Sequence, residues 1–255
     1  MNRYSIRPLE ETGLVTTLLT GIGLGRWLSN DPQGHENYRA VAAELGIPAE
    51  RTVGTFQRHT SHVEAVDGSE GGKYTLWRPD EITPRDGIVT DEPGLLLTSI
   101  ESDCTPVFLL DPVKKAIGMV HSGWKGTAAQ ITVNAIRLMG ERYGSAPRDV
   151  LAAFGPCICR DCYEVGGELI DSFRENYTPE ELEQVFLPRS EGKYSLDLKR
   201  AIRFSLEKEG LQPDHIYDFN SCTMHEGRFY SHRARAKAGL PTDLNMLTGI
   251  MLKSE

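Results

Sequence analysis

Short apolar runs and longer amphipathic segments divide much of the chain into predicted strands and helices. The strand-like runs are rich in Leu and β-branched residues and lie at 94–100, 105–111 and 115–121. Residues 51–66 predict a strand, a polar turn and a second strand. Apolar residues at helical spacing predict helices at 32–46, 126–144, 164–177 and 197–210. In the last helix, Asp197 is placed as an N-cap and Gly210 as a C-terminal stop.

The order of these elements indicates the fold class. Groups of strands are followed by a helix and then by further strands, which differs from the regular alternation of a doubly wound parallel sheet. We therefore expect an α+β protein with more than one mixed sheet. Because no linker-like stretch divides the chain, we expect a single domain over residues 1–255.

Composition and charge narrow the range of partners. The 255 residues are 39% hydrophobic and 25% charged, which is typical of a globular protein with a substantial core. A net charge of −8, without a long Lys/Arg run, makes nucleic acid an unexpected partner. Residues 13–25 are apolar, but Thr and Gly interrupt them, and they are too short to span a membrane. Five cysteines, an odd number, favour a reduced, cytoplasmic chain.

Three residues far apart in the sequence could form one site. His59 lies in a polar turn after a strand, Cys104 at the head of another strand, and His121 at the tail of the strand after that. A thiolate and two imidazoles suit zinc and leave a fourth position for water or substrate. The same thiol and imidazole could also form a Cys/His catalytic pair, and a buried cysteine beside a capped histidine is the structural alternative.

The segment SGWKGT follows His121 and opens a predicted helix. Lys125 and the free backbone N–H groups at this helix start would favour an anion such as phosphate. The alternative is an ordinary tight turn in which Trp124 anchors the core.

The segment CICRDC, residues 157–162, has a spacing that suggests a second metal site. Neither a second CxxC pair nor a histidine lies near it in the sequence, so we interpret it as a reduced, buried cysteine cluster. His35, His215 and His225 lie in polar contexts and are assigned no role.

Four segments occur in a recognisable order: FQRHTSHV, DGIVTDEPGLLLTSIESDCTPVFLLD, AIGMVHSGWKGTAAQI and GPCICRDCYEVG. They are similar to Q-x-H-x-x-x-V, to D-A-L-V-T-x-x-P-G-x-x-L followed by A-D-C-x-P-V, to H-A-G-W-R-G-T and to G-P-x-I-x-x-x-C-Y-E-V-G. These are motifs of the laccase-domain (YfiH-type) family, once called polyphenol oxidases. The resemblance runs from about Thr55 to the end of the chain.

The resemblance implies a fold, a cofactor and an activity. The fold is an α+β arrangement of packed mixed sheets with flanking helices, shared with the catalytic domain of the cytotoxic necrotizing factor toxins. The family's metal ligands fall on His59, Cys104 and His121, and the expected metal is zinc rather than copper. The family's activities are phosphorolysis of purine nucleosides and methylthioadenosine, and adenosine deamination. The expected small-molecule partners are therefore a purine nucleoside and phosphate.

The chain departs from the family's pattern in three places. In the divergent N-terminal part, residues 1–50, Leu18 stands where an arginine is expected. The family's S-Y-R-R appears as residues 231–234, SHRA, and its Arg after Gly-Trp is Lys125. Fewer arginines around an anion-binding pocket would weaken phosphate binding, whereas deamination needs no phosphate.

Roles can be assigned to individual residues on this basis. The predicted catalytic residues are Cys104, His121 and Asp103, although Asp103 could instead support the ligands from behind. The predicted substrate contacts include anion-binding side chains and polar residues near the metal ligands: Gln57, His62, Lys125, Arg160 and Arg233.

Three other functions remain open from sequence. A metal-free Cys/His hydrolase or deamidase would use Cys104 as nucleophile and His121 as base, without needing His59. A copper-dependent phenol oxidase is possible because thiolates and imidazoles bind copper, but seven scattered histidines fall short of a multicopper laccase. A zinc-stabilised, partner-binding protein is the non-enzymatic alternative.

Overall fold

The computed structural model describes residues 2–254, which contain three β-sheets and eight α-helices. The five-stranded sheet has the order β1, β2, β14, β6, β3, with bounds Arg3–Tyr4, Val15–Thr20, Met246–Leu252, Leu96–Glu101 and Thr52–Gly54. The six-stranded sheet has the order β13, β9, β7, β8, β5, β4, with bounds Ile216–Asp218, Leu151–Phe154, Thr105–Asp111, Ala116–Ser122, Gly87–Thr90 and Val63–Ala65. The small sheet is β10, β12, β11: Glu164–Gly166, Lys193–Leu196 and Phe186–Ser190.

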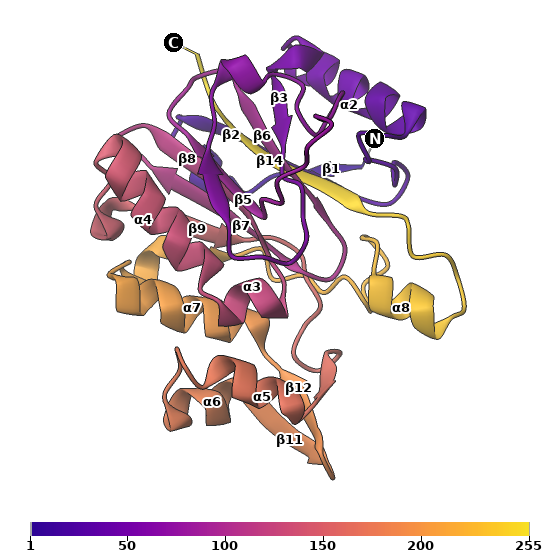
Figure 1. Cartoon of the computed structure of the whole chain (residues 1–255), viewed down its shortest axis with the longest axis vertical. Coiled ribbons are helices and arrows are strands. Elements are labelled where there is room, and N and C mark those ends of the chain that lie inside the picture. The colour runs from indigo at the N-terminus through magenta and orange to yellow at the C-terminus, as the bar shows by residue number, and fades with distance from the viewer. Residues whose placement is uncertain (1, 255) are drawn as a thin grey trace.

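The helices flank these sheets (Figure 1). Their bounds are α1 Arg7–Glu10, α2 Pro32–Leu45, α3 Trp124–Ala128, α4 Ile131–Tyr143, α5 Glu168–Phe173, α6 Pro179–Val185, α7 Leu198–Glu209 and α8 His232–Lys237. Short 3₁₀ turns occupy Ala49–Arg51, Gly68–Glu70, Pro147–Asp149 and Pro213–His215. The parallel and antiparallel strand pairs within one sheet confirm the predicted mixed α+β class.

The two large sheets share an apolar core, and helices cover the far face of the six-stranded sheet. Strand β7 shows the arrangement through its alternation. Phe108 and Leu110 belong to the cluster shared with the five-stranded sheet, whereas Val107 and Leu109 pack in the cluster that contains residues of α4 and α7. A strand buried on both faces is apolar at nearly every position, which explains the continuous run at 105–111.

Two of the predicted helices have the expected ends. In α2 the Asp31 side chain accepts the backbone N–H of Gln33, and Gly46 ends the helix with a φ of 71°. In α7 Asp197 accepts the N–H of Arg200, and Gly210 is left-handed with a φ of 108°.

Two other predicted helices differ from the structure. The segment 126–144 is broken by Gln130, whose φ of 62° separates α3 from α4. In the segment 164–177, residues 164–166 form strand β10 instead, because they pair with β12, and the helix α5 begins after Gly167. The β11–β12 hairpin was not predicted, and it lies with α5 and α6 at the end of the molecule opposite α2 (Figure 1).

The antiparallel pairing of β7 and β8 positions the predicted ligands. Thr105 pairs with Ser122, and Pro106 pairs with His121. Cys104, one residue before β7, therefore lies beside the end of β8. A thiol at the head of one strand and an imidazole at the tail of the next are neighbours because the two strands form a hairpin.

Candidate functional site

The three predicted metal ligands converge. One side-chain donor atom from each of His59, Cys104 and His121 lies within 4.8 Å of the others. The Cys104 Sγ is 3.7 Å from Nε2 of His59, and the two imidazole rings meet edge to face with centroids 4.9 Å apart. His59 comes from the β3–β4 loop, so three separate chain segments build one donor set.

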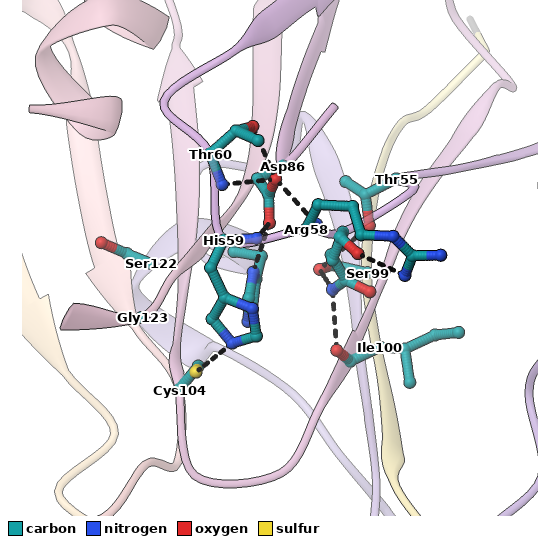
Figure 2. Close-up of polar contacts among 12 residues, drawn as sticks. Thr55, Arg58, His59, Thr60, Asp86, Ser99, Ile100, Cys104, Ser122 and Gly123 are labelled. Atoms are coloured by element: carbon teal, nitrogen blue, oxygen red, sulfur yellow. Dashed lines mark hydrogen bonds and ion pairs between the residues drawn. The ribbon is translucent and has the colours of Figure 1, made fainter. Parts of the chain in front are cut away.

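A buried carboxylate holds the His59 loop in place (Figure 2). Asp86 accepts the backbone N–H groups of Arg58, His59 and Thr60 at 2.9–3.1 Å, together with the Thr60 hydroxyl at 2.7 Å. His59 has a φ of 58°, a left-handed conformation that non-glycine residues rarely adopt. The Asp86 bonds hold this backbone conformation, which turns the imidazole toward Cys104.

Asp86 also orients the second imidazole. Its Oδ1 is 2.8 Å from Nδ1 of His121, so Nδ1 carries the proton and Nε2 is directed to the donor set. Despite the burial of Asp86, its hydrogen bonds, first among them that with His121, lower its pKa to about 2. Burial opposes a charge on His121, but the neighbouring Glu101 and Cys104 outweigh it and raise the pKa of His121 well above its ordinary value.

Glu101 is a second buried carboxyl group at the site. Burial raises its pKa to about 7, and its Oε1 accepts the Ser99 hydroxyl at 2.6 Å. Its Oε2 is 3.8 Å from Nε2 of His121 and lacks a hydrogen-bond partner among the residues that the structure describes. Burial therefore favours the uncharged form of this carboxyl group, and the neighbouring His121 opposes that effect.

These residues fit a bound zinc ion. Partial burial and the neighbouring His121 lower the pKa of His59, which favours the neutral imidazole that binds metals. Gly123 leaves room at the centre, because a Cβ there would come within 2.8 Å of the Cys104 Sγ and 2.9 Å of His59 Cδ2. One thiolate and two imidazoles form a donor set that zinc accepts with a position left open.

The donor set opens into a cavity of about 450 Å³. The cavity is lined by aromatic, apolar and polar side chains from several loops: Leu28, Gln57, His59, Ile100, Ser102, Asp103, Cys104, His121, Trp124, Ile158, Tyr163, Leu198, His232, Arg233 and Asn245. A cavity of this size suits a small molecule with a ring and a polar periphery.

The structure brings three of the predicted supporting residues to this cavity. Gln57 lines it, but its amide donates to the Ser99 hydroxyl at 2.8 Å and to the Ile100 carbonyl at 2.7 Å. Asp103 accepts the Thr223 hydroxyl and the backbone N–H of Arg233, at 2.6 and 2.7 Å. The Arg233 guanidinium lies over the Tyr163 ring, 5.3 Å from its centroid.

The other three predicted contacts are outside the cavity lining. His62 is exposed, with Nδ1 2.9 Å from the Pro84 carbonyl oxygen. Lys125 is exposed over the Trp124 ring. Arg160 pairs with Asp161 and lines a separate cavity of about 390 Å³. Their substrate-binding roles remain predictions.

Sequence reasoning missed Asp86 and Glu101. Asp86 stands directly before strand β5, where an acidic residue in the sequence RDG resembles an ordinary turn. Glu101 is the last residue of β6. Only 1% of its surface is exposed, which distinguishes it from surface glutamates. The sequence signal that could have found both residues is that each is an acidic residue at the end of a short apolar run, as Cys104 and His121 are at theirs.

The fold and the site define an α+β protein with a candidate mononuclear metal centre in a small-molecule cavity. The chain belongs to the family whose model is described as multi-copper polyphenol oxidoreductase laccase, which matches residues 11–252. The match confirms the family predicted from the motifs, and it includes most of the N-terminal part that was expected to diverge.

Relatives and solved structures agree with this assignment. The purine nucleoside phosphorylase YlmD of Geobacillus stearothermophilus is 36% identical over 198 residues, covering 77% of this chain and 72% of the relative. The crystal structure of Bacillus licheniformis hypothetical protein YfiH matches with a TM-score of 0.85 and 28% identity, covering 98% and 96% of the two chains. The crystal structure of the Geobacillus YlmD gives a TM-score of 0.83 and 31% identity, covering 94% and 92%.

Two features of the N-terminal part, Leu18 and the apolar segment 13–25, can also be compared with the structure. Leu18, which stands where the family pattern has an arginine, is buried in the apolar cluster around Trp27 and Leu96. It supplies packing there instead of charge. None of the helices formed by residues 2–254 is long and apolar enough to cross a membrane.

Proposed function

We propose that the chain is a zinc-dependent purine nucleoside enzyme that phosphorolyses adenosine, inosine, guanosine and methylthioadenosine, and that also deaminates adenosine. The observation that carries the proposal is the convergence of His59, Cys104 and His121 at the wall of a cavity that also contains Arg233. The relative at 36% identity is named a purine nucleoside phosphorylase. Localisation in the cytoplasm, inferred from the cysteine content, belongs to the same proposal.

His59, Cys104 and His121 would hold the zinc, which when bound supplies a Lewis acid and lowers the pKa of water at its open position. Asp86 keeps Nδ1 of His121 protonated and the ring oriented. The phenol ring of Tyr163 and the indole of Trp124 provide apolar surface for a purine. Arg233, which also lines the cavity, provides a cation for phosphate.

In phosphorolysis, a phosphate oxygen forms a bond to C1′ of the ribose while the bond from C1′ to the base nitrogen breaks. The electron pair stays on the base, which takes up a proton. The products are the free purine and ribose 1-phosphate, or methylthioribose 1-phosphate when the substrate is methylthioadenosine. In deamination, water adds at C6 of adenosine and ammonia departs, leaving inosine. Arg233 serves the first reaction because its charge faces an anion that the second reaction lacks.

A metal-free Cys/His hydrolase is the second candidate, and one observation favours it. Cys104, His121 and Asp86 are arranged in the order nucleophile, base and orienting carboxylate. His59 distinguishes the two functions, because a hydrolase of this kind has no use for a second imidazole 3.7 Å from the nucleophilic sulfur.

Metal analysis combined with nucleoside turnover tests the proposal. The protein is purified without added metal, beside His59→Ala, Cys104→Ala and His121→Ala, with His35→Ala, which lies outside the cavity lining, as the matched control. Adenosine is supplied with and without phosphate, and inosine, adenine and hypoxanthine are followed. Zinc loss from this site and loss of turnover in all three variants, but not in the control, is the expected result. Unchanged turnover in His59→Ala would overturn the proposal in favour of the hydrolase.

A further inference from the structure

A second group of metal-binding side chains lies outside the candidate active site. Each of four residues offers one ligand atom, and these atoms lie within 4.8 Å of one another: Cys159, Cys162, Cys222 and His225. The sequence had suggested a cysteine cluster without a histidine nearby. The fold corrects this, because His225 Nδ1 is 3.3 Å from the Cys162 Sγ and 3.9 Å from the Cys159 Sγ.

The spacing of these atoms matches tetrahedral coordination. Zinc bonds of about 2.3 Å to sulfur and about 2.0–2.1 Å to nitrogen place neighbouring ligand atoms about 3.5–3.8 Å apart. The distances from His225 Nδ1 to the two sulfur atoms, 3.3 and 3.9 Å, bracket this value. Three thiols and one imidazole fill all four positions, which is the composition of a closed structural site rather than of a catalytic one.

The backbone around the cluster is arranged as two short turns of equal spacing. Cys159 and Cys162 are three residues apart, and the N–H of Cys162 donates to the Cys159 carbonyl at 3.0 Å. Cys222 and His225 have the same spacing in the segment between β13 and α8. The N–H of Cys159 donates to the Cys222 Sγ at 3.3 Å, and a backbone bridge joins Cys157 to Cys222. An amide donor to sulfur favours the thiolate, which is the form that binds a metal.

We propose that Cys159, Cys162, Cys222 and His225 form a second metal site, which binds zinc and serves a structural role. The site would join two chain segments that are about sixty residues apart in the sequence. Cys222 is buried, the other two cysteines are half-buried and His225 is exposed, so the metal would reach the cluster from solvent.

This cross-link lies directly behind the candidate active site. Ile158 and Tyr163 flank the first turn, and both line the 450 Å³ cavity. Thr223, within the second turn, donates to Asp103, which also accepts the N–H of Arg233. A metal that fixes the two turns would therefore fix the wall that contains Tyr163 and Arg233.

Cobalt substitution tests the site without reference to any activity. The wild-type protein is stripped of metal under reducing conditions and titrated with Co²⁺, whose near-ultraviolet sulfur-to-cobalt absorption grows with the number of bound thiolates. Variants Cys162→Ser and His225→Ala remove cluster ligands, and Cys104→Ala removes the single thiolate of the other site. His225→Cys restores four ligands, and circular dichroism checks that each variant is folded.

We expect two equivalents of tetrahedral cobalt in the wild type. Cys104→Ala should lose one equivalent and the smaller part of the sulfur absorption, whereas Cys162→Ser and His225→Ala should lose the other equivalent and the larger part. His225→Cys should restore it. If the proposed active-site zinc were wrong, the Cys104→Ala result alone would change, so the two proposals fail separately.

Thiol protection in the wild type gives a second measurement in case a variant does not fold. Zinc should protect Cys159, Cys162 and Cys222 from alkylation, as peptide mass mapping would show. A single cobalt equivalent that depends only on Cys104 would overturn the proposal. So would a Cys159–Cys162 disulfide that persists under reducing conditions, or alkylation of the three thiols at the same rate with and without zinc.

Discussion

Asp86 Oδ1 lies 2.8 Å from Nδ1 of His121, and the same carboxylate accepts three successive backbone N–H groups of the loop that carries His59. One buried side chain therefore sets the orientation of two imidazoles from different parts of the chain. The positions of the proposed metal ligands therefore depend on a residue that would not itself touch the metal.

Replacing this carboxylate should weaken metal binding without removing a ligand. In Asp86→Asn the amide N–H₂ group faces backbone donors, and the charge that holds His121 is lost. We expect zinc affinity to fall about 10- to 100-fold, the usual effect of removing such a supporting carboxylate. Competition with a chromogenic chelator would measure it. Asp91→Asn, at an exposed position, is the control and should leave the affinity unchanged.

Substituting Gly123 tests whether the donor set has room for any side chain between Cys104 and His59. In Gly123→Ala the new Cβ would lie 2.8 Å from the Cys104 Sγ and 2.9 Å from His59 Cδ2, both well inside normal contact distance. We expect loss of metal from this donor set, with the second proposed site and the fold retained, as measured by metal content and circular dichroism. Gly140→Ala on α4 meets the Ser145 carbonyl at 3.2 Å and should keep its metal. Full metal occupancy in Gly123→Ala would contradict the compact donor set.

The sequence and the family motifs predicted the three side chains that the fold brings together, but not the carboxyl groups that support them. Cys104 and His121 lie at the outer ends of two consecutive apolar runs, so a hairpin between the runs brings them together. Asp86 acts through hydrogen bonds to backbone groups 26–28 residues earlier, and the hydrophobic pattern contains no trace of such bonds. Long-range pairing is a property of the whole fold.

The group formed by Cys159, Cys162, Cys222 and His225 also shows that sequence patterns do not reveal long-range partners. Local spacing drew attention to Cys159 and Cys162, but the segment was interpreted as a reduced cysteine cluster without a metal. Cys222 and His225 were missed because they come from a segment about sixty residues later. His225 was set aside for its polar surroundings. From the sequence alone, a candidate metal-binding histidine in a polar loop looks like any exposed histidine. Only the fold shows that thiols lie next to it.

Arg233 should separate the two proposed reactions. Its guanidinium donates to the Glu164 carbonyl at 3.0 Å and retains further N–H groups that can reach an anion in the cavity. In Arg233→Ala we expect the KM for phosphate to rise about 10- to 100-fold, the cost of one charge-assisted hydrogen bond. Adenosine deamination should change far less. Arg137→Ala is the control, because Arg137 on α4 is exposed and pairs only with Glu209 among the ion pairs of the described residues. Equal losses in both reactions would contradict a phosphate-binding role.

Arg85 should be the most costly charged residue to remove for stability. It is fully buried, and its Nη1 lies 2.8 Å from a Glu64 oxygen and 2.6 Å from a Glu70 oxygen. Its other nitrogens donate to the Gly54 carbonyl. Arg85→Ala removes both ion pairs and the side-chain donors of the Gly54 carbonyl, although Lys73 still pairs with Glu70 at 3.0 Å. We therefore expect a loss of about 3 kcal/mol in the free energy of unfolding, the lower end for breaking a buried pair. Urea denaturation of the metal-free protein measures it, with the exposed Arg137→Ala as a control that should change little.

Asp103 tests whether a residue beside the ligands takes part in proton transfer or in positioning. Its two oxygens accept the Thr223 hydroxyl and the Arg233 backbone N–H, so the carboxylate ties two loops together. Asparagine retains one acceptor oxygen, so Asp103→Asn should displace Arg233 and raise the KM for phosphate. The kcat of deamination and its pH profile should stay close to those of the wild type. A general acid or base at this position would instead cost about 10²–10⁴ in both reactions and remove one limb of the pH profile. Asp171→Asn, at an exposed position, supplies the matched control. Because the two roles differ in which reaction is lost, one variant assayed with and without phosphate decides between them.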